Sequence, residues 1–485
     1  MSSMRLLLAF ILLALPLPPL LAQSADLGPH VAAILKEAPA GTRIGLLVTT
    51  LEGAEVLAVA PDQRFIPASN TKMFTTAVAY AHLAALDGAA RGTGVVLEGA
   101  ESRPDVVLLG RGDPRLSSAA DCMQTCLAAL ADAVAARTMR VNDIIGDDRW
   151  FPDERWSPGM SWNNIPTRSG TGTSALTLDD NELAVLVRPA AVGAAPTVEE
   201  LRYFTLDNQA LTVPGGEVKI GWWRDPGGFT VRLMGTIGAD APAERLRFGI
   251  DNPAHYAAWR LREFLVARGV DVKGRLLTRH RPVLPQDDPA ERTGPVAPAP
   301  ADDGMLATVP ASPVAEDVAI INKLSQNLHA ELLLRHLGRL AGTGSIAEGW
   351  AVMQAVLAQA GMPENGVDLS DGSGMSSYNR ITPRAAVTLL GWAARQSWGT
   401  AWRESLPVGG RDGTLRRRFA GTALDGRIFA KTGSLNATNT LSGYLLAKSG
   451  RTLIFSILSN DCPDGETDKA IAAMDKALLA IAEAN

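Results

Sequence analysis

The sequence predicts an α+β protein in which the two ends of the chain share one five-stranded antiparallel sheet and the middle is a large, mainly β insertion. Strand-like runs rich in Val, Ile and Leu occur as a pair near the start and as a group of three near the end, and helical patterns flank both groups. The 485 residues suffice for two or three domains, and a composition of 46% hydrophobic and 20% charged residues excludes wholesale disorder and a multi-pass membrane protein.

The first 22 residues have the pattern of an export signal. Arg5 is followed by an apolar run that ends at Pro16, and Ala22 is a small residue at a plausible cleavage point before Gln23. An uncleaved anchor is the competing interpretation, but the run is shorter than the ~20 residues that a spanning helix needs. We therefore expect cleavage, a periplasmic or other extracytoplasmic location, and no membrane span in the mature chain.

The N-terminal part of the predicted sheet is a pair of strands, Arg43–Thr50 and Ala54–Ala60, joined by a turn at Gly53. A short helix over 29–36 precedes the pair, and a helix from Pro67 to about Leu86 follows it.

Three further strands form the C-terminal part of the sheet: Arg427–Ser434, Thr438–Leu446 and Thr452–Ser459. A closing helix has apolar residues at spacings of three and four on one face, from Ile471 to Ile481. Because short strands are marginal alone, we expect all five to join in one sheet covered by the terminal helices.

Residues 89–305 form the expected insertion, in which short strands alternate with turns. Six prolines between 282 and 300 indicate a linker or an exposed loop at its end. The mature chain is thus divided into a discontinuous domain, 23–88 with 306–485, and the inserted part. Helical patterns resume at about 313, at 347–360 and after Thr382, which suits an N-cap before Pro383. The strands expected within the insertion are Asp105–Leu109, Glu182–Val187, Glu217–Trp222 and Phe229–Gly235.

Charge and cysteine content restrict the remaining possibilities. Forty-six Lys and Arg against 51 Asp and Glu give a net charge of −5, so there is no electrostatic reason to expect a nucleic-acid partner. Three cysteines are too few for a disulfide scaffold. Cys122 and Cys126 can bridge only if their segment is not a regular helix, which leaves both states open, and Cys462 is expected to be free.

Ser69 and Lys72 form the first motif that carries chemistry. They lie one helical turn apart at a predicted helix start, so the amine can reach the hydroxyl. A neutral Lys can take the proton of Ser and make it a nucleophile, and the backbone N–H of Ser69 can stabilise an oxyanion. An isolated S-x-x-K is usually an N-cap and a surface cation, but Lys72 alone among the nine Lys has a Ser three residues before it.

A second motif, Lys431-Thr432-Gly433-Ser434, lies on a predicted strand. A cation and a hydroxyl beside a Gly that permits close approach suit a ligand carboxylate, and the Ser434 N–H could be a second oxyanion donor. The alternative is a strand-end charge and a turn. Lys448-Ser449-Gly450 also fits the pattern, but we reject it because a hairpin turn explains it.

The third motif is Ser325 with Asn327. The pattern S-x-N occurs four times in this chain and is weak by itself. Only Ser325 lies between two helical runs, where a loop can present a hydroxyl and an amide to one cleft.

Together the three motifs resemble the active-site serine penicillin-binding proteins and β-lactamases. Other stretches resemble the D-alanyl-D-alanine carboxypeptidase/endopeptidases of the class C low-molecular-mass group, peptidase family S13. Ser69 and Ser325 are 256 positions apart, which leaves room for the insertion of that family that an ordinary class A β-lactamase lacks. These stretches are Gly110–Pro114, Ser174–Leu176 with Asn181, Asp371–Ser376 with Asn379, Thr382-Pro383, Leu406–Gly410 and Gly413–Arg416.

The resemblance implies a β-lactamase/transpeptidase-like domain and an exported hydrolase that acts on peptidoglycan peptides and is acylated by β-lactams. Ser69 would be the nucleophile and Lys72 its base, Ser325 would relay a proton to the departing amine, and Asn327 would hold the peptide. Lys431 and Thr432 would bind the terminal carboxylate, with Gly433 and Ser434 beside them. No cofactor is implied, and the six His lack metal-binding spacing.

Two departures from the family pattern concern the site. Ser169–Thr173 lacks an expected aromatic residue and Pro, and Gln326 and His329 replace the more usual Asp and Tyr. A serine β-lactamase and a non-catalytic wall-binding homologue stay as alternatives, and the sequence leaves open whether carboxypeptidase or endopeptidase activity would dominate.

Overall fold

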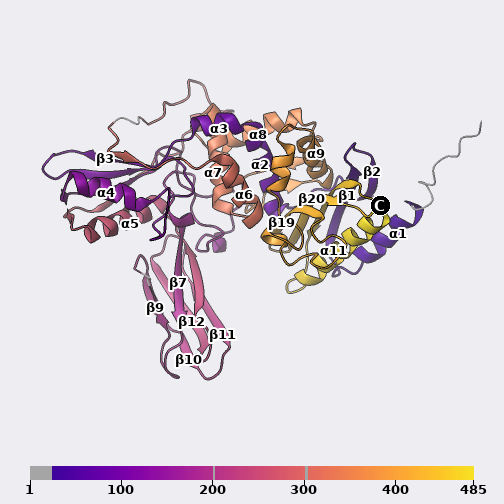
Figure 1. The fold of residues 1–485 in the computed structure, drawn as a ribbon, viewed down its shortest axis with the longest axis horizontal. Helices are drawn as coiled ribbons and strands as arrows, with labels where there is room; N and C mark the ends of the chain where they lie inside the picture. The colour runs from indigo at the N-terminus through magenta and orange to yellow at the C-terminus, as the bar shows by residue number, and fades with distance from the viewer. Residues whose placement is uncertain (1–23, 200–201, 301–303) are drawn as a thin grey trace, which may run out of the picture.

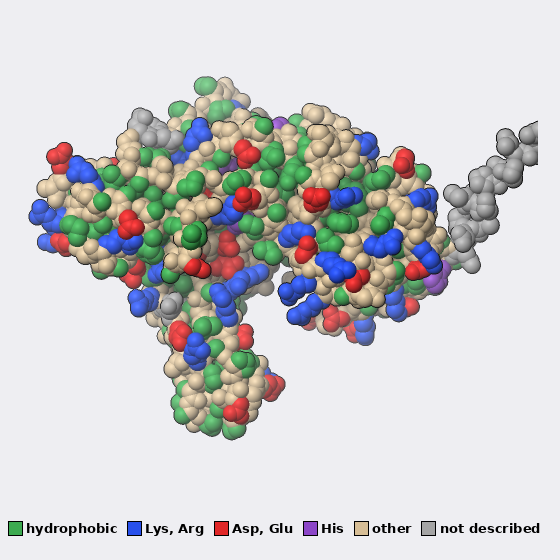
Figure 2. Space-filling model, in the orientation of Figure 1, with side chains coloured by type: hydrophobic (Ala, Val, Ile, Leu, Met, Phe, Trp, Pro, Cys, Tyr) green, Lys and Arg blue, Asp and Glu red, His purple; other side chains and the backbone are tan. Residues whose placement is uncertain are grey.

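The structure is a computed structural model that describes residues 24–199, 202–300 and 304–485. The predicted export signal therefore lies outside the described residues. Helices and sheets at the two ends of the chain form one body, and residues of the insertion extend away from it as a second sheet and a long β arm (Figure 1). The arm also projects from the rest of the molecule in the space-filling view (Figure 2).

The predicted terminal sheet is confirmed. Its strand order is β19-β20-β21-β1-β2, and every neighbouring pair is antiparallel. The N-terminal strands therefore continue the sheet that the C-terminal strands begin, and β19 is left as an edge. The strands are β1 (Arg43–Thr50), β2 (Glu55–Val59), β19 (Ile428–Leu435), β20 (Thr438–Leu446) and β21 (Thr452–Asn460).

Helices cover both faces of this sheet, because successive apolar side chains of a strand point to opposite faces. Leu46 and Val48 of β1 pack with the terminal helices, α1 (Ser24–Leu35) and α11 (Thr467–Ala484). Leu47 faces the opposite side and joins the main helical core. That core contains α2 (Thr71–Ala81), α6 (Val314–Leu324), α7 (Asn327–Ala341), α8 (Ile346–Gln359) and α9 (Pro383–Ala394).

The predicted helix from Pro67 to Leu86 is divided into three parts. It starts as a 3-10 turn, Ala68–Asn70, continues as α2, and resumes as α3 (Leu83–Ala89) after a break at His82. The helix start at Thr382 is confirmed, since its side chain accepts the N–H of Ala385 and Pro383 follows it.

The inserted part contains a second five-stranded sheet of order β15-β6-β4-β3-β16, in which β4–β6 and β6–β15 are parallel. Its core includes two helices that the sequence analysis missed, α4 (Leu127–Arg137) and α5 (Pro253–Ala267). The last strand of this sheet in sequence, β16, lies just beyond the expected boundary at 305, and the domain division stays a prediction. The strands are β3 (Gly94–Glu98), β4 (Asp105–Leu109), β6 (Ile144–Asp147), β15 (Leu276–Arg279) and β16 (Ala307–Thr308).

The arm is built from short antiparallel and parallel strands (Figure 1). The three strands predicted there exist with bounds shifted by up to three residues, and the expected Asp105–Leu109 is β4. The arm contains β7 (Glu182–Arg188), β8 (Thr197–Val198), β9 (Thr205–Asn208), β10 (Leu211–Val213), β11 (Val218–Trp223), β12 (Thr230–Gly238) and β13 (Glu244–Gly249). Shorter elements elsewhere are β5 (Arg140–Val141), β14 (Asp271–Val272), β17 (Val367–Asp368), β18 (Arg380–Ile381) and α10 (Gly399–Glu404).

The Pro-rich stretch is mostly exposed, as expected, but it is anchored at one buried residue. The Asp287 carboxylate accepts hydrogen bonds from Arg281 and from the hydroxyl of Thr343, between α7 and α8.

Cys122 and Cys126 form a disulfide immediately before α4, and Cys462 is free and buried. Among the described helices, none combines the length and apolar character that crossing a bilayer would require.

Candidate active site

Ser69 lies in the 3-10 turn that leads into α2, and it is partly exposed between buried neighbours. Two glycines allow other segments to approach this turn closely. A Cβ on Gly374 would lie 1.9 Å from the Ala68 carbonyl oxygen, and one on Gly433 would lie 2.8 Å from that of Pro67. The turn is therefore held between the loop that contains Gly374 and strand β19.

Lys72 is fully buried one turn after Ser69. Its Nζ is 2.8 Å from the Oγ of Ser69, 2.7 Å from the Oδ1 of Asn327 and 2.6 Å from the backbone oxygen of Ser373. The Nδ2 of Asn327 donates to the Ser169 carbonyl, which turns Oδ1 toward the lysine. A neutral amine has two N–H groups and one lone pair. If Asn327 and Ser373 accept the two N–H groups, the lone pair faces the Ser69 hydroxyl.

The surroundings of Lys72 shift the pKa of its amine. Burial lowers the pKa of Lys72 to about 7, because desolvation disfavours the ammonium form, and the charges of Asp371 and Glu331 act in the opposite direction. A substantial fraction of the amine is therefore neutral at neutral pH, as proton abstraction from a serine requires.

Glu331 is a site residue that sequence reasoning missed. It lies on α7, and its carboxylate accepts the backbone N–H groups of Gly372 and Ser373, at 3.2 and 2.9 Å. Glu331 thus holds the backbone at Ser373, the residue whose carbonyl accepts from Lys72. Burial, followed by repulsion from Asp371, raises the pKa of Glu331 to about 7. Its position four residues after Asn327 on a predicted helix is the signal that could have identified it.

Asp371 organises the same loop without contacting the Ser69 hydroxyl. Its carboxylate accepts the backbone N–H groups of Gly374 and Ser376 and the side-chain amide of Asn379. Asp371 therefore shapes this loop through its hydrogen bonds.

Ser325 and Asn327 occupy the junction between α6 and α7, as the sequence predicted. Ser325 has a left-handed backbone with φ of +60°, and Asn327 is the first residue of α7. The side chain of Gln326 caps α7 by accepting the N–H of Leu328, and His329 contacts Asp180 of the inserted part at 2.9 Å. The two unusual residues at this motif therefore have structural partners.

Lys431 lies on edge strand β19, and its fully buried Nζ is 3.0 Å from the Oγ of Ser325. Nζ also donates to the Thr432 carbonyl at 2.9 Å, while the Thr432 hydroxyl is 2.7 Å from that of Thr414. Burial, with the nearby charge of Lys72, lowers the pKa of Lys431 well below its ordinary value. The rejected motif at Lys448 is in the turn between β20 and β21.

The remaining residues of the second motif lie at the open edge of the sheet. The N–H of Ala430 donates to Pro407, away from β20. Because N–H directions alternate along a strand of regular register, the N–H of Ser434 points the same way. The structure thus brings Ser69, Lys72 and Asn327 into contact, and separately Ser325, Lys431 and Thr432, with the two groups joined where Gly433 meets the Ser69 turn.

One cluster in the described chain has the residue types of a metal site: Asp148, Asp153 and His280. Its atoms are already engaged. Asp148 contacts the Nδ1 of His280 and the hydroxyl of Ser174, and Arg155 donates to Asp153 and lies 3.2 Å from the other nitrogen of His280. The guanidinium of Arg155 supplies the positive charge that a metal ion would bring to this cluster, so we assign no metal there.

Comparisons with known proteins agree on one family. The chain matches the D-Ala-D-Ala carboxypeptidase 3 (S13) family over residues 27–481. It is 34% identical over 465 residues to the D-alanyl-D-alanine carboxypeptidase of Actinomadura sp. (strain R39), which covers 90% of this chain and 82% of that protein. It is 21% identical over 458 residues to the D-alanyl-D-alanine carboxypeptidase DacB of Haemophilus influenzae, covering 90% of each.

The fold agrees with these sequence relationships. The crystal structure of penicillin binding protein 4 (dacB) from Haemophilus influenzae matches with a TM-score of 0.75 at 19% identity, covering 92% of this chain and 98% of the other. With a family match over almost the whole chain, this protein belongs to the D-Ala-D-Ala carboxypeptidase (S13) family of serine peptidases.

Proposed function

We propose that this protein is an exported serine D-alanyl-D-alanine carboxypeptidase that acts on peptidoglycan peptides through an acyl-enzyme and is inhibited by β-lactams. One observation carries the proposal: the buried amine of Lys72 is 2.8 Å from the Oγ of a partly exposed Ser69. With a pKa of about 7, this amine can accept the proton that makes the serine nucleophilic.

In the acylation step, Ser69 transfers its proton to Lys72, and its Oγ attacks the carbonyl carbon of the penultimate D-alanine. The negative charge passes to the carbonyl oxygen. The N–H groups of Ser69 and Ser434 are the proposed donors to this oxyanion, and each such donor is typically worth ~3 kcal/mol.

Collapse of the tetrahedral intermediate breaks the C–N bond and needs a proton for the departing amine. Ser325, within 3.0 Å of Lys431, is the proposed relay, which receives a proton from the lysines as it donates its own. The terminal carboxylate is placed beside Lys431 and Thr432, where the cation and the hydroxyl can both bind it. D-Alanine leaves, and an ester remains on Ser69.

Water completes the reaction when it attacks the ester with Lys72 as base, which releases the shortened peptide and restores the Ser69 hydroxyl. A β-lactam would form the same ester, but its leaving amine stays tethered to the acyl group. In a cross-link, a second peptide takes the place of the terminal D-alanine, and only the leaving group differs. The proposal therefore also includes endopeptidase cleavage of cross-links by the same steps.

Labelling with a fluorescent penicillin tests the nucleophile. We expect the wild type to be labelled once per chain and Ser69→Ala to be unlabelled, whereas labelling of Ser69→Ala at the wild-type level would refute the assignment. Lys448→Ala is a matched control for Lys431→Ala, because both lysines belong to K-[ST]-G motifs but Lys448 lies in a turn. Only Lys431→Ala should slow acylation.

Product analysis tests the activity. Release of D-alanine from a pentapeptide, with nitrocefin giving a burst and then slow decay, is the expected result; sustained rapid nitrocefin turnover without D-alanine release would make the protein a β-lactamase. An N-terminus at Gln23 in the protein recovered outside the cytoplasm would support export, and an intact N-terminus retained in the cytoplasm would refute it.

A further inference from the structure

A large cavity lies between the inserted part and the helices that carry Ser325 and Asn327. Its volume is about 1040 Å³, which is at the upper limit of ordinary small-molecule sites and suits an oligomeric ligand. Strands β7 and β13, helix α5 and the segment 114–120 supply one side. Ile320 and Leu324 of α6 and His329 of α7 supply the other.

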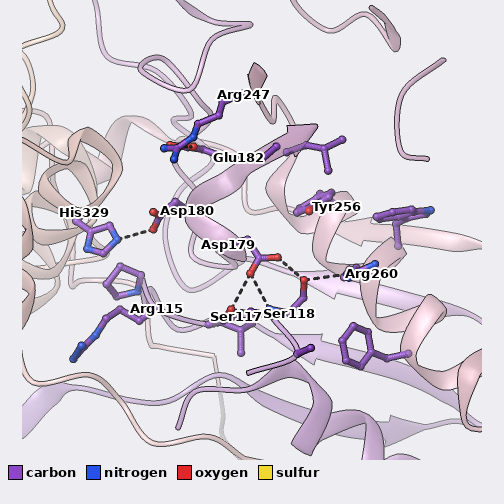
Figure 3. A pocket seen from close by; sticks show the side chains of 18 of the residues that line it. Arg115, Ser117, Ser118, Asp179, Asp180, Glu182, Arg247, Tyr256, Arg260 and His329 are labelled. Carbon is purple, nitrogen blue, oxygen red and sulfur yellow. Dashed lines mark hydrogen bonds and ion pairs between the residues drawn. The ribbon is translucent and has the colours of Figure 1, made fainter. Parts of the chain in front are cut away.

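The acidic residues of the cavity are occupied by neighbouring groups (Figure 3). Asp179 accepts hydrogen bonds from the hydroxyls of Ser117 and Ser118 and from the backbone N–H of Ser118. Asp180 contacts His329 at 2.9 Å, and Glu182 pairs with Arg247 at 3.6 Å. These carboxylates are consequently satisfied within the protein.

Two other arginines of the cavity are less closely paired, although the charge of Arg245 also acts on Glu182. Within the described residues, Arg245 forms no ion pair, and Arg260 is held by the hydroxyl of Ser118 at 3.1 Å and by the ring of Phe264. Arg245 is exposed on β13, two residues before Arg247, so both guanidinium groups project from the same face of the strand. A guanidinium fork binds carboxylates through paired hydrogen bonds, which indicates a ligand with carboxylates.

The floor of the cavity favours a peptide. Tyr256 and Trp259 of α5 stack with ring centroids 5.8 Å apart, and the partly exposed Trp259, supported by the buried Tyr256, offers an apolar surface beside the arginines. An acidic peptide of a few residues presents both apolar side chains and carboxylates, and it matches this combination and the volume.

The position of the cavity relates it to the reaction. Leu324, which lines it, directly precedes Ser325, and its side chain is exposed. In the proposed reaction Ser325 donates to the departing amine, so the leaving group lies next to Ser325. A leaving group longer than one residue would therefore extend from Ser325 past Leu324 into the cavity.

We infer that this cavity binds the acidic peptide on the leaving-group side of a cross-linked peptidoglycan substrate, with Arg245 and Arg260 contacting its carboxylates. The inference rests on the proposed function, and it adds a second substrate site that a free D-alanine leaving group would not reach. It predicts that the cavity affects cleavage of cross-links and leaves release of terminal D-alanine unaffected.

Two substrates and a matched control test the inference. The substrates are a purified cross-linked peptide dimer and a short blocked peptide that ends in D-Ala-D-Ala. Arg245→Glu should lower kcat/KM for the dimer about tenfold or more, because it replaces an attraction by a repulsion, and it should leave D-alanine release and penicillin labelling unchanged. Arg260→Gln should give a smaller loss for the dimer. Arg275→Glu, an exposed arginine of the inserted part outside the cavity, should change neither reaction.

Binding to the inactive Ser69→Ala variant gives a second measurement. A free acidic tetrapeptide should bind about tenfold more tightly than the same peptide with amidated carboxyl groups, and Arg245→Glu should abolish that preference. Equal binding of the two peptides, or wild-type cleavage of the dimer by Arg245→Glu, would overturn the inference. A wild type that releases D-alanine but does not cleave the dimer would also overturn it and would leave the proposed carboxypeptidase intact. Absence of both labelling and D-alanine release would refute the proposed function itself.

Discussion

Replacing Asn327 with Asp tests whether a neutral Lys72 is the base. The Oδ1 of Asn327 is 2.7 Å from the Nζ of Lys72, and its Nδ2 donates to the Ser169 carbonyl at 2.8 Å. The two side chains have almost the same shape, so Asn327→Asp changes mainly the charge beside the amine. A carboxylate there stabilises the ammonium form, and we expect the pKa of Lys72 to rise from its value of about 7.

The size of the rise follows from Coulomb's law. Two unit charges 2.7 Å apart interact by about 6 kcal/mol at an effective dielectric constant of about 20, or roughly four pKa units. The new carboxylate loses hydration and faces the Ser169 carbonyl, which reduces the effect, and we expect a rise of at least about two units. At pH 7 the neutral fraction of Lys72 then falls from about one half to about one hundredth, a loss of about fiftyfold in acylation rate.

The second-order rate constant for penicillin acylation, measured from pH 5.5 to pH 10, reports this change. For the wild type the rate should rise with pH through about 7, because the base acts in its neutral form. For Asn327→Asp the rise should move to about pH 9 or above. Asn327→Ala removes the acceptor without adding charge, so it should lower the rate without that alkaline shift. A midpoint that stays near pH 7 in Asn327→Asp would refute the assignment of Lys72 as base.

Three further substitutions have distinct expected results. Glu331→Gln keeps the acceptor oxygen but removes a charge that raises the pKa of Lys72, so the midpoint of the pH profile should move down by roughly one unit; an upward shift would contradict this. Lys431→Ala should lower kcat/KM about a hundredfold for a substrate with a free terminal carboxylate and much less for its amide; equal losses would exclude Lys431 from carboxylate binding. Gly374→Ala places a Cβ 1.9 Å from the Ala68 oxygen and should lower the free energy of unfolding by about 3 kcal/mol or more. Gly361→Ala, where φ is also positive but nothing lies within 4 Å, should cost only about 1 kcal/mol by thermal unfolding, and equal Tm losses would show that the contact with the Ser69 turn is unimportant.

The terminal sheet could be predicted because its strands alternate regularly and are joined by recognisable turns. The pairing of β1 with β21 joins residues about 400 positions apart. It could still be predicted, because the five apolar strands at the chain ends had only one another as partners. In the inserted part, the sequence does not restrict which strands can pair in this way. β16 has two residues, and parallel pairs such as β4 with β6 are joined by long crossovers, so local patterns do not select the partners. Asn252 followed by Pro253 is a local signal for the start of α5, because Asn252 caps this helix and Pro is favoured at the first helical position.

The three site motifs could be found because their chemistry imposes spacing within a turn or a strand. Spacing alone could mark Glu331 as a neighbour of Asn327, but it could reveal neither the loop that Glu331 contacts nor the cavity arginines. Glu331 acts on a loop 41 residues away in the sequence. Arg245 is of interest because it has no ion-pair partner among the residues that the structure describes, and only the fold determines this. The same holds for Ser169, where the sequence indicated a departure from the family but not the hydrogen bond that its carbonyl accepts from Asn327.

The two buried lysines of the site explain why a substrate carboxylate can matter for the base as well as for binding. Asp371 and Glu331 favour the charged form of Lys72, whereas burial and the charge of Lys72 both lower the pKa of Lys431. In the free protein a proton is therefore favoured on Lys72 over Lys431, and at pH 7 about half of Lys72 is protonated and cannot act as a base. A terminal carboxylate that binds beside Lys431 supplies the missing negative charge and favours the proton there. The charge on Lys431 would then disfavour one on Lys72, so we expect binding of a free terminal carboxylate to increase the neutral fraction of the proposed base.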